Sequence, residues 1–557
     1  MKKLNRIALS AISLGLLATT AMSFNANQVS AQDEDSNRGD LVMAMMSDVV
    51  TLDPHGSNDT SSAQVRINLY ERLTMTDRDM NLVPGLATEW EALDDTTWNF
   101  KLREGTTFHS GAEFTGEDVK ATLDRVLDPA VGSEVAFLFD MIEEVEVVGD
   151  YEVNIHLEYP FAPLQSHLAH NTAGIMSKEV IDKDYQNALD EAGLDMTLEE
   201  YYELREEGGD AYEEVFVDVS EFLGNVIAVE PDGTNHLKFV SRSAGSNVVT
   251  EFFEDFQGGD RNFDTVTFTV VPESGSRIAE LETGGAQIVK ELDATNYDRV
   301  AQGENTEVVE SASLRTDYLG MNVNVEPFDD INVRRAVAHA IDPQIIVDGI
   351  FNGIGTVATG PIAEGVFGYD AEQATQVYDL DLAREYLAES SVPDGFSTTL
   401  WVRNEEQFVN IALIIQENLA ELGIDVEIEQ MEWGTYLDRT ANGEQEMYIL
   451  GWTTVTADAD YGLYALYHSD NFGAPGNRSF HSTPELDEAL DAGRTEPEED
   501  SRLEAYSLAQ EIIIDEAPNV FLIHQNFVAG YNSSQISGIY VDAIGDVRFE
   551  EVEFLDQ

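Results

Sequence analysis

The chain has 557 residues, too many for one hydrophobic core, so at least two domains are expected. Its 43% hydrophobic residues can fill those cores, and its formal charge of −76 excludes nucleic acid as a partner because phosphates would be repelled. With no cysteine in the chain, disulfides, thiol catalysis, cysteine-ligated metal sites and a lipidated cysteine anchor are excluded as well.

Residues 1–31 are predicted to be a secretory signal peptide. Lys2, Lys3 and Arg6 precede an apolar stretch over 7–22, and Val-Ser-Ala at 29–31 is a small-residue cleavage site. An uncleaved anchor helix is the alternative, but the apolar run is short and rich in Ser, Thr and Gly. We therefore expect an exported protein, periplasmic or at the cell surface, without a lipid anchor.

Acidic residues are spread along the whole chain. Removing the predicted signal takes away three bases and no acids, so the charge becomes −76 − 3 = −79, and only six lysines remain. This composition favours a surface adapted to high salt, where charges are screened over about 3 Å at molar ionic strength. An acidic patch for a cationic partner is the alternative, and the even spread of acids argues against it.

The first half of the chain alternates predicted strands and helices. After a solvated leader over 32–40 we expect a strand over 41–46 and a polar loop over 47–58. Short strands are expected within 84–160, together with a helix that starts near Thr115. A helical insertion over 186–217, broken at Gly208-Gly209, is followed by a strand over 264–272 and a helix ended by Gly284-Gly285.

A second unit begins near residue 313. "YLGMNVN", "TTLWV", "IDVEIEQM", "MYILGW" and "NVFLIHQ" predict strands, while "DINVRRAVAHAID", "QFVNIALIIQENLAELG" (ended by Gly423) and residues 497–516 predict helices. Short alternation of strands and helices indicates a mixed α/β fold.

No catalytic or metal motif is complete. The sequence lacks G-x-S-x-G, a Walker loop and a dinucleotide-binding fingerprint. His167 and His170 lack the Glu of H-E-x-x-H, and the calcium-like start at Asp458 has Leu463 where Gly is needed. We expect no enzyme activity, no metal and no cofactor.

The stretch "LREGTTFHSGAEFTGEDVKATLDRV" at 102–126 closely resembles the signature of the extracellular solute-binding proteins of the oligopeptide/dipeptide-binding type, which deliver ligands to ABC importers. Similar segments follow the family order, including "TLDPH", "LVPGLATEWE", "YLGMNVNVEPFDDINVRRAVAHAIDP", "GPIAEGVFGYD" and "GNRSFHSTPELDEAL". The resemblance covers nearly everything after residue 40. Within the signature, Phe108 and Phe114 are expected in the core, His109 in a polar turn and Glu117-Asp118 at a helix start.

The resemblance implies the two-lobed periplasmic-binding-protein-like fold (type II), with mixed sheets, flanking helices and an extra subdomain in lobe 1. The lobes would be hinged by crossing strands and would enclose the ligand. On this basis we expect lobe 1 over 32–312, with a subdomain at about 84–225 and completion by 530–557, and lobe 2 over 313–529.

The resemblance also implies a binding site. The loop after the "GW" strand places Trp452, Thr453 and Thr454 against the ligand, and Arg403 of "LWVRN", followed by Asn404, stands within one residue of the Arg that holds the ligand carboxylate in relatives. Such a contact contributes about 1.5–3 kcal/mol. The alternatives are that Trp452 is a core residue and that Arg403 is a solvated surface residue.

One implied residue is missing, because Val455 occupies the position of the Asp that binds the ligand amine in relatives. Either Asp458 or Asp460 reaches the amine, with Tyr461 beside them, or the ligand lacks an amine there. It is equally open that both aspartates cap a turn.

We therefore expect a monomeric binding protein that captures an oligopeptide, a dipeptide or a glutathione-like peptide and docks on an ABC transporter permease. A non-peptide cargo (nickel chelate, haem or oligosaccharide) is kept open by Val455. A secreted hydrolase is the remote alternative.

Overall fold

The computed structural model describes residues 38–373, 375–473 and 476–555. The predicted signal peptide over 1–31 lies outside these residues. Within the described part of the chain, no helix is long and apolar enough to cross a membrane.

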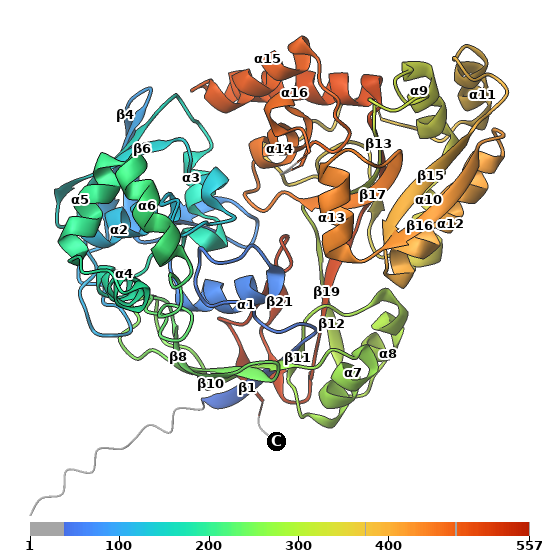
Figure 1. Cartoon of the computed structure of the whole chain (residues 1–557). Helices are drawn as coiled ribbons and strands as arrows, with labels where there is room; N and C mark the ends of the chain where they lie inside the picture. Colours follow the sequence, from blue (N-terminus) through green and yellow to red (C-terminus); the bar gives the residue numbers. More distant parts are fainter. Residues whose placement is uncertain (1–37, 374, 474–475, 556–557) are drawn as a thin grey trace, which may run out of the picture. The chain divides into compact units, whose positions relative to one another are not determined.

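Seven strands form the first sheet: β1 (Gly39–Met45), β8 (Leu237–Ser243), β9 (Asn247–Phe252), β10 (Phe263–Val270), β11 (Ile288–Val289), β12 (Glu307–Ala312) and β19 (Asn526–Tyr531). Their order is β12–β19–β11–β1–β10–β9–β8, and β1 runs parallel to both of its neighbours (Figure 1). Alternate residues Leu41, Met43 and Met45 of β1 are buried in its core. Helices α1 (Thr60–Leu69), α7 (Ser274–Thr283) and α8 (Tyr297–Ala301) belong to the same part of the chain.

A four-stranded antiparallel sheet with its own core lies in the first half of the chain. It is formed by β4 (Ala87–Asp94), β5 (Thr97–Leu102), β6 (Ile142–Gly149) and β7 (Glu152–Leu157), in the order β4–β5–β7–β6. Helix α2 (Gly116–Val126) packs against β6. The helices that follow are α3 (Leu164–Leu168), α4 (Lys178–Ala192), α5 (Leu198–Glu207) and α6 (Asp210–Ser220).

The second half of the chain builds a six-stranded sheet from β13 (Arg315–Met321), β14 (Thr356–Val357), β15 (Ser397–Arg403), β16 (Asp425–Met431), β17 (Met447–Thr453) and β18 (Asn519–His524). The order is β14–β18–β13–β17–β15–β16. Its helices are α9 (Ile331–Ala340), α10 (Pro343–Ile350), α11 (Leu380–Ala388), α12 (Glu406–Ala420), α13 (Trp433–Ala441), α14 (Ala465–Tyr467), α15 (Pro484–Thr495) and α16 (Glu499–Glu516). Three small two-stranded pairs complete the fold: β2 (Thr74–Thr76) with β3 (Leu82–Pro84), β20 (Ile536–Ser537) with β23 (Glu553–Phe554), and β21 (Tyr540–Val541) with β22 (Val547–Arg548).

The chain passes between the two large sheets at two neighbouring points, from β12 to β13 and from β18 to β19. The Ser313 hydroxyl donates a hydrogen bond to the carbonyl of Gln525, which joins the two crossing segments. Leu314 N–H donates to the Ala543 carbonyl at 2.8 Å, and the Leu314 carbonyl accepts from Thr454 N–H at 2.9 Å. Leu314 therefore couples the crossing segment to the loop that follows β17.

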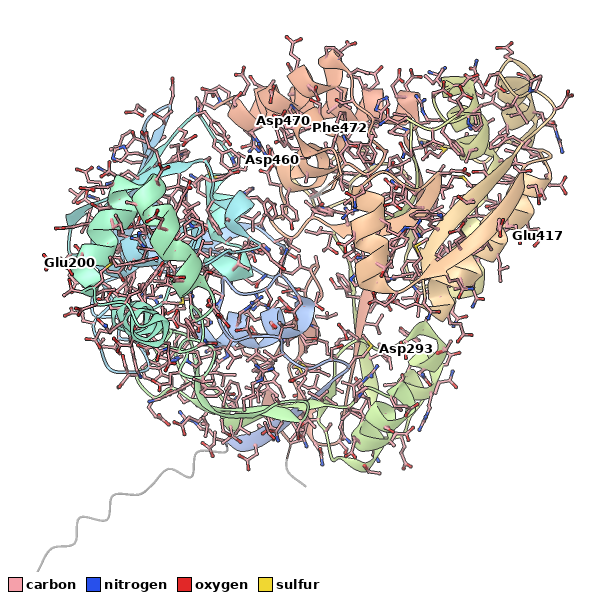
Figure 2. The ribbon with its side chains drawn as sticks, viewed as in Figure 1. Glu200, Asp293, Glu417, Asp460, Asp470 and Phe472 are labelled. Atoms are coloured by element: carbon pink, nitrogen blue, oxygen red, sulfur yellow. The ribbon has the colours of Figure 1, made fainter. Side chains whose placement is uncertain are left out.

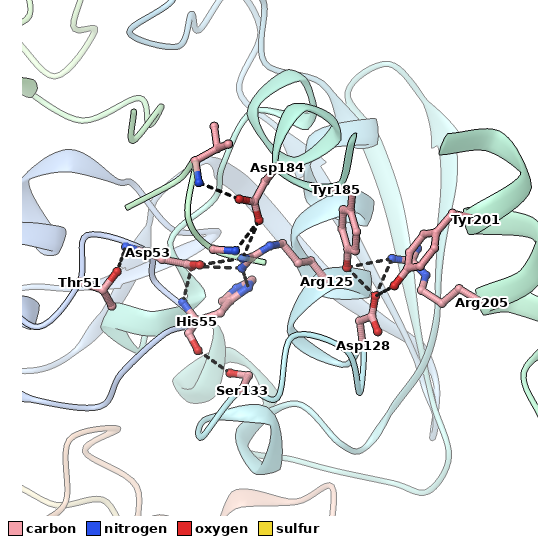
Figure 3. Close-up of polar contacts among 12 residues, drawn as sticks. Thr51, Asp53, His55, Arg125, Asp128, Ser133, Asp184, Tyr185, Tyr201 and Arg205 are labelled. Atoms are coloured by element: carbon pink, nitrogen blue, oxygen red, sulfur yellow. Dashed lines mark hydrogen bonds and ion pairs between the residues drawn. The ribbon is translucent and has the colours of Figure 1, made fainter. Parts of the chain in front are cut away.

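The signature segment is scaffold, as expected. Phe108 and Phe114 are completely buried, and Nε2–H of His109 donates to the Asn235 carbonyl at 2.8 Å. Helix α2 begins after Thr115, as the sequence predicts. Fully buried Arg125 lies 2.6 Å from Asp53 Oδ2 and 2.9 Å from His55 Nδ1 (Figure 3).

The predicted elements of the second unit are also confirmed within a few residues. One difference is at α12, which ends at Ala420 rather than at Gly423, because Glu421 and Leu422 already form a turn. Gly423 follows with a φ of 72°, a conformation that glycine adopts without strain. The lobe boundaries stay a prediction.

Candidate ligand-binding site

A cavity of about 430 Å³ is lined by segments of both large sheets. This volume lies within the range of about 300–1,000 Å³ that is usual for small-molecule sites. From the part of the chain that carries the seven-stranded sheet come Met46, Thr60, Lys290, Glu291, Leu292, Asp293, Ala294, Asn526, Phe527, Val528, Val541, Gly545 and Val547. From the part that carries the six-stranded sheet come Arg315, Phe351, Ile354, Arg403, Glu405, Gln407, Phe408 and Gln525.

Arg403, the last residue of β15, lines this cavity with a side chain that is 22% exposed. Its guanidinium carbon lies 3.6 Å from the ring centroid of Phe408 and 5.2 Å from that of Trp433. Burial lowers the pKa of Arg403 from its usual value, although nearby Glu405 opposes this. Its Nε lies 3.1 Å from Glu405, but within the described residues neither Nη group has a hydrogen-bond acceptor. The outer edge of the guanidinium is therefore available to a carboxylate.

The other cations of the cavity are held by the protein itself. Lys290 Nζ lies 3.3 Å from Asp546 Oδ1 and 3.3 Å from the Thr60 carbonyl, and it is buried. Arg315 donates to Asp317 Oδ1 through Nη2 at 2.6 Å and through Nε at 3.1 Å. These contacts fix the cavity wall.

Trp452 and Tyr461 pack against each other. Trp452 Nε1–H donates to the Tyr461 carbonyl at 3.0 Å, and the ring centroids are 5.2 Å apart. Trp452 is half-buried at the edge of two hydrophobic clusters, so it contributes to the packing of the core independently of any ligand. Tyr461 and Asp460 line a second cavity of about 320 Å³, which Asp470 also lines. Asp460 and Asp470 lie near each other in Figure 2. The structure thus places Arg403 and Tyr461 at different cavities.

Asp458 and Asp460 are each paired with an arginine. Both carboxylate oxygens of Asp458 lie 2.8 Å from Arg502 Nη2. Asp460 accepts from Arg494 Nε at 2.8 Å and Nη2 at 3.0 Å. Asp458 Oδ1 also accepts the N–H of Asp460 at 3.0 Å, which is the turn-capping arrangement left open by the sequence.

The pKa values of the two buried aspartates shift in opposite directions. Burial raises the pKa of Asp458, and Arg502 offsets only part of the effect. Burial alone would also raise the pKa of Asp460, but Arg494 and His167 hold it well below its usual range. Either aspartate would have to share its carboxylate with an arginine to bind a ligand amine.

The remaining predicted site residues line neither cavity. Thr454 is buried and bonded to Leu314, Thr453 is half-buried opposite Arg315 in the sheet, and Asn404 is exposed. Sequence reasoning missed Arg494 and Arg502, which lie 34 and 44 residues from the aspartates they pair with. No local pattern in the sequence marks these two pairs.

Comparison with known proteins then decides the family. Residues 81–474 match the family described as "Bacterial extracellular solute-binding proteins, family 5 Middle". The chain belongs to the family 5 extracellular solute-binding proteins. This confirms the family that the signature indicated, a family of extracellular solute-binding proteins, and the solved structures confirm the fold.

Individual relatives of this family 5 protein align over almost its full length. The glutathione-binding protein GsiB of Salmonella typhi is 31% identical over 525 residues, which cover 92% of this chain and 94% of GsiB. The periplasmic binding protein DppA of Helicobacter pylori, solved with the peptide STSA, has a TM-score of 0.76 at 27% identity and covers 93% of this chain and 99% of DppA. The oligopeptide-binding protein AppA of Bacillus subtilis, at 24% identity and a TM-score of 0.72, shares the fold and covers 93% of this chain and 99% of AppA.

Proposed function

We propose that this protein is the substrate-binding subunit of an ABC importer, that it binds short peptides in the 430 Å³ cavity, and that it releases them unchanged to a membrane permease. The observation that carries the proposal is Arg403, which lines the cavity and whose Nη groups have no acceptor in the described part of the chain. A peptide's terminal carboxylate matches this planar donor pair in charge and geometry.

Several further features support a peptide rather than another cargo. The relatives GsiB and DppA bind glutathione and a tetrapeptide respectively. The cavity is lined from both large sheets, which are joined at two crossing segments. A ligand that contacts both sheets would stabilise the closed arrangement of the two lobes, because ligand shifts a conformational equilibrium toward the form it binds better.

Trp452, Thr453, Asp460 and Tyr461 stay proposed ligand contacts, but none of them lines the 430 Å³ cavity, and Asp460 and Tyr461 line the second one. The Trp452–Tyr461 pair offers an aromatic surface with little side-chain entropy to lose on binding. Asp458 is held by Arg502 and Thr454 by Leu314, so both stabilise the loop that follows β17.

Calorimetric titration in molar KCl would test the proposal. Dipeptides, the tetrapeptide Ser-Thr-Ser-Ala and glutathione would be titrated into the protein, with a nickel–histidine chelate, haem and an oligosaccharide as comparison ligands. We expect one-to-one binding of at least one peptide and recovery of that peptide with unchanged mass. Binding of a comparison ligand alone would replace the peptide assignment, and cleavage of a peptide would replace the transport assignment with a hydrolase.

A further inference from the structure

The resemblance to dipeptide-binding proteins implies an amine-binding Asp at the position of Val455, and the structure limits which carboxylate can take its place. Val455 packs at the edge of the core of the four-stranded sheet. Asp458 and Asp460 are both buried and engaged with Arg502 and Arg494. A ligand ammonium therefore needs a different carboxylate.

The cavity that Arg403 lines has three carboxylates of its own: Glu291, Asp293 and Glu405. Glu405 lies 3.1 Å from Arg403 Nε, and Asp293 accepts a hydrogen bond from the Ser274 hydroxyl. Among the described residues, the carboxylate of Glu291 has neither a hydrogen bond nor an ion pair. It is half-buried at the cavity wall. In a half-buried position a carboxylate without a partner is poised to gain from a cation.

The backbone around Glu291 holds the residue in place. Its φ is +60°, a left-handed conformation that a non-glycine residue keeps only where the surroundings enforce it. On one side Lys290 is anchored to Asp546, and on the other Leu292 N–H donates to the Val528 carbonyl at 3.0 Å. The Glu291 carbonyl itself accepts from buried Arg277 at 3.4 Å.

We propose that Glu291 binds the ammonium group of the ligand and so takes the part of the missing aspartate. The inference rests on the proposed function. Glu291 follows β11 of the seven-stranded sheet, whereas Arg403 ends β15 of the six-stranded sheet. A zwitterionic peptide bound by both residues bridges the two sheets, with its ammonium on one and its carboxylate on the other. The ligand of this protein is therefore a peptide with a free amino group.

The test compares a peptide with its N-acetylated form on the wild-type protein and on Glu291→Gln. Glutamine keeps the shape of the side chain and removes its charge. We expect the wild type to bind the free peptide at least about 10-fold more tightly than the acetylated one, since a charge-assisted contact is lost on acetylation. Glu291→Gln should lose this preference and bind the acetylated peptide as the wild type does.

Asp298→Asn is the matched control, because it removes one negative charge from an exposed position of α8 outside the cavity. It should keep the wild-type preference. An unfolding transition like that of the wild type shows that Glu291→Gln folds, and Glu291→Ala provides a second variant. If the wild type binds the free peptide and Glu291→Gln retains the full preference, the inference is overturned while the proposed function stands. If the wild type binds neither peptide, the proposed function itself fails.

Discussion

Arg403 is prepared for an anion by its neighbours. The aromatic faces of Phe408 and Trp433 fix the plane of the guanidinium and stabilise its charge, while Glu405 occupies only the Nε side. Arg439 has similar contacts, since it lies over the ring of Trp401 at 4.3 Å and is paired through Nε with Glu444 at 2.8 Å, but it does not line the cavity. Its position at the cavity wall is what distinguishes Arg403.

Arg403→Ala should weaken binding of a peptide with a free carboxylate by about 10- to 100-fold, because a charge-assisted bidentate contact is lost. Arg403→Lys should also weaken binding, since an ammonium cannot stack flat on the two rings or donate two parallel hydrogen bonds to a carboxylate. Titration calorimetry with the peptide and its C-terminal amide measures both effects. The amide should not distinguish Arg403→Ala from the wild type, and exposed Arg384→Ala should bind as the wild type does.

The Asp458–Arg502 ion pair is expected to stabilise the fold rather than to bind ligand. Arg502→Met would leave the fully buried Asp458 carboxylate without its partner, and we expect a loss of about 3–5 kcal/mol in the free energy of unfolding. Arg299→Met, at the exposed pair with Glu282, should have no measurable effect. Denaturant titration in molar salt compares the variants. Equal stability of both would mean that Asp458 stays neutral in the fold.

At the residue scale, the sequence could predict the position of Arg403 but not the pairing partners of Asp458 and Asp460. Arg403 lies at the end of a strand in a segment that resembles the family, so its position follows from local sequence. The partners of Asp458 and Asp460 come from α16 and α15, and such pairing is set by tertiary packing. Glu291 is one of 106 acidic residues, and only the cavity and the positive φ single it out.

At the element scale, Asp118 joins the starts of two helices. Its Oδ2 accepts the N–H of Thr115 at 2.8 Å at the start of α2, and its Oδ1 accepts the N–H of Lys178 at 2.7 Å at the start of α4. The sequence predicts where α2 begins, because apolar residues at helical spacing follow Thr115 and acids stand in the first turn. The link to α4, sixty residues away, depends on the packing of the two helices.

Asp118→Ala should therefore destabilise the protein by about 1–3 kcal/mol, since it leaves two partly or fully buried amides without an acceptor. Glu117→Ala is the matched control, because the neighbouring side chain is exposed. Denaturant unfolding measures the difference between the two variants. Peptide affinity should be unchanged in both, since the signature segment is scaffold. A larger loss for Glu117→Ala would mean that helix-dipole interactions outweigh the buried contacts.

At the scale of the whole molecule, buried neutral histidines link stability to pH. Burial lowers the pKa of His55 to about 3, that of His109 to about 4 and that of His170 to about 3. Because these folded-state values lie below the unfolded value of about 6.5, the stabilisation is complete above pH 6.5 and is lost as the pH falls toward 4. We expect unfolding free energy to fall by up to about 1.4 kcal/mol per pH unit for each histidine. Denaturation at pH 7, 6 and 5 checks this, and His109→Gln should flatten the profile.

The net charge makes the stability of the whole molecule depend on salt concentration. Oxygen-tipped side chains are seen all round the outline of the molecule in Figure 2, and with 106 acids against 30 bases most acids have no basic side chain to pair with. Their mutual repulsion opposes the compact state, and salt weakens it as the screening length falls from about 10 Å at 0.1 M to about 3 Å at 1 M. The melting temperature should therefore rise steeply with KCl up to about 1 M and then level off. Sucrose, which stabilises folded proteins without screening charge, should give no such plateau. A melting temperature that is independent of KCl would show that the acidic surface is not adapted to salt.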